Sequence, residues 1–167
     1  FREFSVLANE GNEEAQNFIA YMHENGEGVS KSQKLALYWY RKAALQGFSL
    51  AQCNLGYLYE KGRGTAKDFN QAVNWYRKAA NQGNSRCQNN LGLMYDLGNG
   101  VVKDYQEAFR WYLKAANQGN EYGQYNLGLL YEYGNGVSQN FKLALSWYQK
   151  ASDQGHSSAK EKVKTIQ

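Results

Sequence analysis

The sequence predicts an all-α solenoid of about ten antiparallel helices, and three observations lead to that prediction. The first is a tryptophan every 36 residues, at Trp39, Trp75, Trp111 and Trp147. The second is the helical spacing of apolar residues in two runs within each 36-residue unit. The third is a set of helix-capping residues at matching positions of the units. Arrays of such units bury their apolar faces against their neighbours.

This period divides the chain into four full units with a partial unit at each end. We expect a lead helix in residues 1–14 and a terminal helix in residues 159–167. The full units are 15–50, 51–86, 87–122 and 123–158. Because no gap or shift in composition interrupts the repeat, we expect one continuous solenoid domain, 1–167.

Two helices are predicted in each unit, and unit 51–86 illustrates them. The first helix has apolar residues on one face, at Ala51, Leu55, Leu58 and Tyr59. It ends at a turn that contains Gly62 and Gly64. The second helix is another apolar run, in residues 69–80. Each unit is therefore a helical hairpin.

Capping residues mark the ends of these helices. The residues before the second helices can accept a hydrogen bond from the free amides of the first turn: Ser32, Asp68, Asp104 and Asn140. The residues before the first helices include three further good caps and a histidine: Asn12, Asn84, Asn120 and His156. Glycines follow the second helices, where a left-handed conformation favours them: Gly11, Gly47, Gly83, Gly119 and Gly155.

Composition excludes several classes of protein. The 167 residues include 14 Tyr, 4 Trp and no Pro, which is too aromatic for a disordered chain and rules out a collagen-like one. No stretch approaches the roughly 18 consecutive apolar residues of a membrane span. Membrane insertion is therefore not expected. The net charge of +4 is dispersed, so nucleic-acid binding is not expected either. The chain begins with Phe1 and has no signal-peptide pattern, so we expect a fragment or a processed product.

The repeated motif resembles a known family. In unit 51–86 it comprises Ala51-Gln52, Asn54-Leu55-Gly56, Leu58-Tyr59, Gly62-x-Gly64, Trp75-Tyr76-x-Lys78-Ala79-Ala80 and Gln82-Gly83. This pattern is similar to the Sel-one-like repeat (SLR), a relative of the tetratricopeptide solenoids, and it covers the whole chain. The resemblance implies a right-handed α/α superhelix whose first helices line a concave groove. His23 and Thr65 are small departures from it, in place of a Tyr and a Val.

We predict no catalytic residue, metal site or cofactor. His23 stands at a packing position and His156 at a capping position. Cys53 and Cys87 lie 34 residues apart without a nearby histidine, which argues against a metal site. They are two residues out of register on adjacent first helices, so a disulfide would need an offset pairing and we expect free thiols. One SLR branch, the Helicobacter cysteine-rich proteins, is described as penicillin-binding or β-lactamase-like. That branch carries a cysteine pair in each unit, which this chain lacks.

Two polar ladders recur on the first helices. The asparagines Asn54, Asn90 and Asn126 carry both a donor and an acceptor. They are expected either to clamp the backbone of a bound peptide or to bond to a neighbouring helix. The acids are Glu24, Glu60, Asp96 and Glu132. They lie near helix C-termini, where the dipole disfavours them, so we expect partners. The candidates are the amides of the Gly-x-Gly turn or the lysines Lys42, Lys78, Lys114 and Lys150.

An apolar patch is the main candidate binding surface. One face of the helix that leads into the last full unit carries Tyr122, Tyr125, Leu129 and Tyr133. Earlier units add Leu93, Leu97 and Tyr57. An exposed Tyr and Leu patch of this kind is typical of a protein-binding hot spot. The alternatives are that the stacking angle of the units buries some of these residues or that a further unit covers them. The tryptophans and the tyrosines that follow them are expected to be core residues instead.

These features predict a non-catalytic scaffold or adaptor, monomeric by itself, that binds a protein or an extended peptide. The resemblance implies an exported bacterial host-interaction or envelope protein, so a periplasmic or secreted location is favoured over a cytoplasmic one. The alternatives are an immunity protein that neutralises a toxic effector and a weak penicillin-binding or β-lactamase-like protein.

Overall fold

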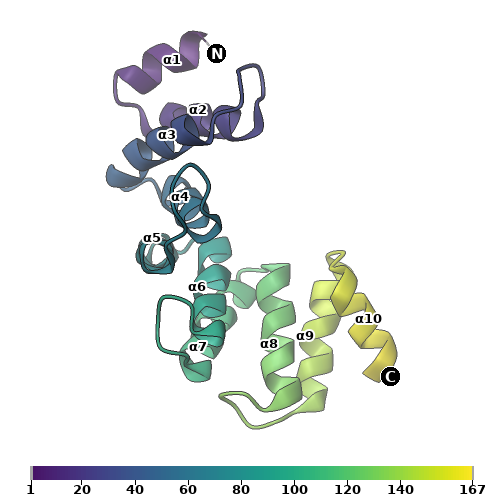
Figure 1. Cartoon of the computed structure of the whole chain (residues 1–167). Helices are drawn as coiled ribbons and strands as arrows, with labels where there is room; N and C mark the ends of the chain where they lie inside the picture. The colour runs from purple at the N-terminus through teal and green to yellow at the C-terminus, as the bar shows by residue number, and fades with distance from the viewer. Residues whose placement is uncertain (1, 167) are drawn as a thin grey trace. The chain divides into compact units, whose positions relative to one another are not determined.

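The computed structural model describes residues 2–166, and ten α-helices contain most of them (Figure 1). Contacts divide the chain into two compact units, Phe1–Gln82 and Gly83–Gln167. The first unit consists of α1 (Arg2–Asn9), α2 (Glu13–Asn25), α3 (Gln33–Leu45), α4 (Ser49–Lys61) and α5 (Phe69–Asn81). The second consists of α6 (Ser85–Leu97), α7 (Tyr105–Asn117), α8 (Glu121–Tyr133), α9 (Phe141–Asp153) and α10 (Ser157–Ile166).

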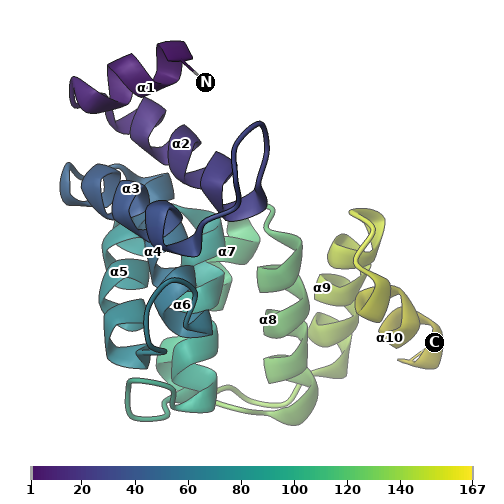
Figure 2. The same cartoon turned by 45° about the horizontal axis from the view of Figure 1, so that its top comes forward.

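The all-α prediction is confirmed, since residues 2–166 contain no strand. Within each of the two compact units, consecutive helices pack as hairpins, as α8 and α9 do in both views of the chain (Figures 1 and 2). Residues 1 and 167, which the expected terminal helices include, lie outside the described residues. The continuity of the two units as one solenoid stays a prediction.

The predicted caps form in the structure. Each residue expected before a second helix accepts a hydrogen bond from the first turn. Asn12, Asn84 and Asn120 do the same for first helices. Phe48 precedes α4 without a side-chain cap. His156 is also a cap, because its Nδ1 accepts from the amide of Ala159 at 3.2 Å.

A buried tyrosine anchors each hairpin. Tyr40, Tyr76, Tyr112 and Tyr148 are the largest fully buried side chains. Three of them pack directly on a glycine of the first helix, namely Gly56, Gly92 and Gly128, where a Cβ atom would come within 2.7 Å of the ring. The tryptophans beside them contribute less to the core than expected. Trp75 is buried, whereas Trp39, Trp111 and Trp147 are half-buried.

A pair of glutamines joins the two helices of each repeat. The glutamine after each second helix donates to a buried glutamine 30 residues earlier, on a first helix. The pairs are Gln46–Gln16, Gln82–Gln52, Gln118–Gln88 and Gln154–Gln124, with N···O distances of 2.7–2.9 Å. These bonds satisfy buried amides and hold the two helices of each hairpin against one another.

The expectation of free thiols is wrong. Cys53 and Cys87 are both disulfide-bonded, and no free cysteine remains in the described part of the chain. Both side chains are buried. The expectation relied on sequence register, which places a residue on its helix but does not determine which sulfur lies within bonding distance of it.

Across residues 2–166, no helix combines the length and the apolar character needed to cross a bilayer.

Candidate functional site

Apolar side chains are exposed on α6 and α8, which are the first helices of the two repeats in the second compact unit, Gly83–Gln167. Leu97 closes α6 and Tyr133 closes α8, and they are 56% and 61% exposed. Tyr122 begins α8 and is 56% exposed. The 36-residue register places Leu97 and Tyr133 at equivalent positions of successive repeats. Three of the predicted patch residues are therefore accessible to a partner.

Other predicted patch residues are half-buried. Tyr125 and Leu129 pack against a core cluster of α9 and α10 that includes Tyr148 and Val163. The Tyr125 ring stacks on His156 with centroids 4.5 Å apart. The alternative that packing of neighbouring helices buries part of the patch therefore holds in part for Tyr125 and Leu129, which pack on α9 and α10.

Leu93 is also half-buried, on α6. Tyr57 of the first unit packs partly on the core of that unit. The guanidinium of Arg63 lies 5.1 Å and the ammonium of Lys61 lies 5.7 Å from the centre of its ring. The Tyr57 face is thus bordered by cations.

The asparagine ladder connects neighbouring first helices. Asn54 donates to the side chain of Asn17 on the preceding first helix at 3.1 Å. Asn126 donates to Asn89 at 2.9 Å, and Asn89 also lies within 3.5 Å of Asn90. These contacts agree with the structural alternative for the ladder, although all three members of it remain partly exposed.

The acid ladder has a different partner from either one expected. Each carboxylate accepts a hydrogen bond from the buried tyrosine 16 residues later: Tyr40 to Glu24, Tyr76 to Glu60, Tyr112 to Asp96 and Tyr148 to Glu132. The two hypotheses for this ladder are therefore wrong. The turn amides, such as those of Gly98 and Asn99, donate to helix carbonyl oxygens instead.

The expected lysines interact with tryptophan rings. The ammonium groups of Lys42, Lys78, Lys114 and Lys150 lie 4.0–5.0 Å from the ring centres of Trp39, Trp75, Trp111 and Trp147. Each lysine follows its tryptophan by three residues on the same helix, so the two side chains share a face. This cation–π contact replaces the ion pair that the sequence suggested.

Two acids of the ladder also bind a cation from a later part of the chain. Arg63 reaches Glu24 at 3.3 Å, and Lys162 of α10 reaches Glu132 at 2.8 Å. Burial raises the pKa of Glu132, but the hydrogen bonds from Lys162 and Tyr148 outweigh it and hold that pKa below its usual value. Burial and the Glu132 contact raise the pKa of Tyr148, so its phenol stays a donor.

Replacing Lys162 by methionine is expected to weaken the docking of α10 by about 0.5–1 kcal/mol at neutral pH. Because the folded-state pKa of Glu132 is lowered, the stability that it contributes is present above its unfolded pKa and is lost as the pH falls through the folded value. Urea unfolding from neutral to acid pH checks this. The loss should shrink in acid, and Lys160→Met, which removes an exposed lysine of the same helix, should show no such trend.

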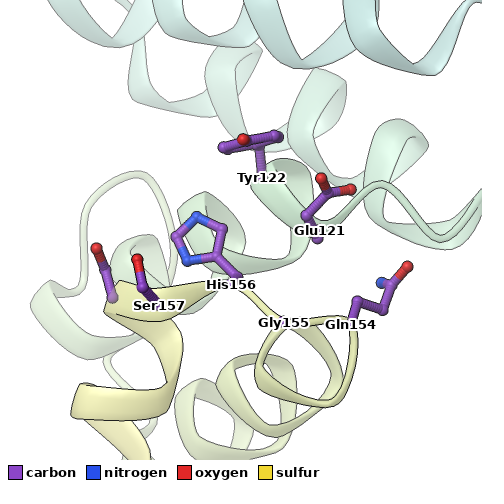
Figure 3. A pocket seen from close by; sticks show the side chains of 7 residues that line it. Glu121, Tyr122, Gln154, Gly155, His156 and Ser157 are labelled. Carbon is purple, nitrogen blue, oxygen red and sulfur yellow. The ribbon is translucent and has the colours of Figure 1, made fainter.

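A shallow pocket of about 320 Å³ lies between the N-termini of α8 and α10 (Figure 3). Glu121 and Tyr122 line one side, and residues 154–158 line the other. Tyr122 and His156 face one another across it, with ring centroids 5.2 Å apart. The sequence patterns mark Tyr122 as a patch residue, His156 as a cap and Gln154-Gly155 as the end of a helix, but none of them predicts a pocket here.

The histidines have structural contacts. His23 is buried, and its Nδ1 lies 3.3 Å from the carbonyl oxygen of Ser30. His156 caps α10. Among the described residues, no group of three or more His, Cys, Asp or Glu side chains is placed to hold a metal ion.

Comparisons with known proteins identify the repeat. The family model "Sel1 repeat" matches residues 13–48, 49–84, 85–120 and 121–156. The structure of a Sel1 repeat protein from Oxalobacter formigenes is 35% identical, with a TM-score of 0.87, over 97% of this chain and 73% of that one. The protective antigen c5321 of uropathogenic Escherichia coli, which displays an SLR fold, is 32% identical, with a TM-score of 0.68.

A third similar structure is the immunity protein Pa5087 of Pseudomonas aeruginosa, with 28% identity and a TM-score of 0.63. The present chain spans 43% of the length of the c5321 chain and 58% of the Pa5087 chain, while the matches cover 98% and 93% of the present chain. No curated protein matches it.

Proposed function

Because this chain belongs to the Sel1 repeat family, whose members are generally protein-interaction scaffolds, we propose that it is a non-catalytic scaffold. It binds a protein or an extended peptide on the first helices of its repeats. The observation that carries the proposal is the exposure of Leu97, Tyr122 and Tyr133 on α6 and α8.

Comparison between repeats supports a binding role for two of these residues. Asn25 and Lys61 occupy the position of Leu97 and Tyr133 in the first two repeats. The fold therefore does not require an apolar side chain there. Leucine and tyrosine that are more than half exposed at such a position are available for contact with a partner.

An exported role is part of this proposal. Disulfides persist in oxidising compartments and are rare in reducing ones. The disulfide-bonded state of Cys53 and Cys87 supports a periplasmic or secreted setting. There the scaffold would act as an adaptor or as a host-interaction protein.

A second candidate is an immunity protein that neutralises a toxic effector. The observation that favours it is the 28% identity with immunity protein Pa5087 over 93% of this chain. The same exposed face would then bind the effector. The identity of the captured partner distinguishes the two roles.

The test is partner capture by a double variant, Leu97→Ser with Tyr133→Ser. Because hot-spot side chains each contribute about 2 kcal/mol or more, we expect at least a tenfold loss of affinity for a partner captured by the native chain. Val102→Ser is the matched control, since it removes an 87% exposed apolar side chain from a turn of the same unit.

Two results would contradict the proposal. One is equal binding of that partner by the native chain and the double variant, with helicity unchanged by circular dichroism. The other is turnover of a chromogenic β-lactam above background, which would contradict the non-catalytic role.

A further inference from the structure

The carboxylates of the acid ladder form a repeated cation site. Glu24 accepts from Tyr40 with one oxygen and contacts Arg63 with the other. Glu132 accepts from Tyr148 with one oxygen and contacts Lys162 with the other. In each case the cation also lies near a tyrosine ring, 5.1 Å from the centre of Tyr57 for Arg63 and 5.5 Å from that of Tyr133 for Lys162. The chain thus shows twice how this position binds a basic side chain.

Asp96 is the equivalent residue of α6, and it has the tyrosine contact alone. Its Oδ2 accepts from Tyr112 at 3.2 Å. Within residues 2–166, no lysine or arginine forms an ion pair with it. The pKa of Lys103 is raised mainly by its hydrogen bond to Tyr105 and less by the charge of Asp96, and its ammonium lies 4.5 Å from the centre of the Tyr105 ring.

The sequence explains why this carboxylate receives no cation from the next repeat. Asn135 stands at the position of Arg63, two repeats later, and Asn126 stands on α8 at the position that Lys162 has on α10. The amide of Asn126 donates to Asn89 instead. The two positions that hold Arg63 and Lys162 elsewhere in the chain are therefore both occupied by uncharged asparagine here.

Apolar side chains border Asp96. Leu97 follows it directly and is 56% exposed, and Leu93 lies one turn earlier on α6 and is half-buried. A carboxylate beside exposed leucine complements a basic side chain, whose methylene stem packs on apolar surface while its charged end pairs with the acid. Lys162 makes this double contact with Tyr133 and Glu132.

We propose that Asp96 receives an arginine or lysine side chain of the bound partner and that Leu97 packs against an apolar residue next to it. The occupant is an extended segment of a partner protein in which a basic residue adjoins an apolar one. This inference rests on the scaffold function proposed above and deepens it, because it states the chemistry that the first-helix face selects.

The probe is a set of short, capped, fluorescein-labelled peptide pools, randomised among neutral residues except at one central position. That position is arginine, lysine, citrulline or glutamate. Citrulline keeps the shape of arginine and lacks its charge. Fluorescence anisotropy should show binding of the arginine and lysine pools, with the citrulline and glutamate pools at least about tenfold weaker.

Variants of the chain test the position of the site. Asp96→Asn keeps an oxygen for Tyr112 and removes the charge, so it should weaken the arginine pool about fivefold or more and leave the citrulline pool unchanged. Asp153→Asn, the same change at an exposed residue of α9, should have no effect. Asn126→Lys should imitate Lys162 and block the arginine pool, whereas Asn126→Met, which also loses the bond to Asn89, should not.

Equal binding of the arginine and citrulline pools, or equal effects of Asp96→Asn and Asp153→Asn, would overturn the inference. The scaffold proposal would survive that result if Leu97→Ser with Tyr133→Ser still abolished binding. Failure of every pool to bind the native chain would also overturn the inference, and the scaffold proposal would then be judged by partner capture alone.

Discussion

Replacing Tyr112 by alanine is expected to lower the free energy of unfolding by about 3–5 kcal/mol. The side chain is fully buried in the core of the second unit, where it packs with Ala108, Leu127 and Leu130. Its ring also lies directly against Gly92. Truncation leaves a cavity that rigid helices on both sides cannot fill. Urea unfolding monitored by circular dichroism and tryptophan fluorescence measures the loss.

The matched variant is Tyr112→Phe, which keeps the ring and removes only the hydrogen bond to Asp96. It is expected to lower the free energy of unfolding by about 1 kcal/mol. If alanine cost no more than phenylalanine, the ring would not be the packing anchor that its burial indicates.

Gly136→Ala is expected to lower the free energy of unfolding by about 3 kcal/mol, from two effects that add. Gly136 has φ +72°, which disfavours a side chain by about 1–2 kcal/mol. A Cβ atom there would also lie 2.7 Å from the carbonyl carbon and oxygen of Tyr105 at the start of α7. Backbone cannot move aside as a side chain can, so this crowding adds about 1–3 kcal/mol.

Gly119→Ala separates the two effects. Gly119 has φ +85° and nothing within 4 Å of a Cβ atom, so only the conformational cost of about 1–2 kcal/mol applies. Thermal and urea unfolding of both variants provide the comparison. Equal losses would show that the approach of the Gly136 turn to α7 contributes nothing to stability.

Helices and caps were predictable because they depend on neighbouring residues. Asp68 caps α5 by accepting from Gln71, three residues away. Gly26 ends α2 in a left-handed conformation, which its lack of a Cβ atom favours. Such contacts lie within one turn, so the order of residues contains all that they require.

The candidate site was predictable only in part. Its position on α6 and α8 followed from the register of the repeat, and Leu97, Tyr122 and Tyr133 are exposed there. Tyr125 and Leu129 share a helix face with Tyr122 and Tyr133, yet they pack partly on the core beside α10. The sequence spacing describes one helix, whereas burial depends on the side chains that neighbouring helices bring to it.

The sequence by itself determined the 36-residue repeat, the all-α hairpins and the family. The order of residues within one repeat specifies the hairpin, and its recurrence along the chain specifies the period and the family. Tertiary structure alone decided the partners of the acid ladder, the state of the cysteines and the contact of Gly136 with Tyr105. These involve residues from 16 to more than 30 positions apart in the chain. The angle and spacing at which helices pack bring such residues within bonding distance, and local sequence does not specify either quantity.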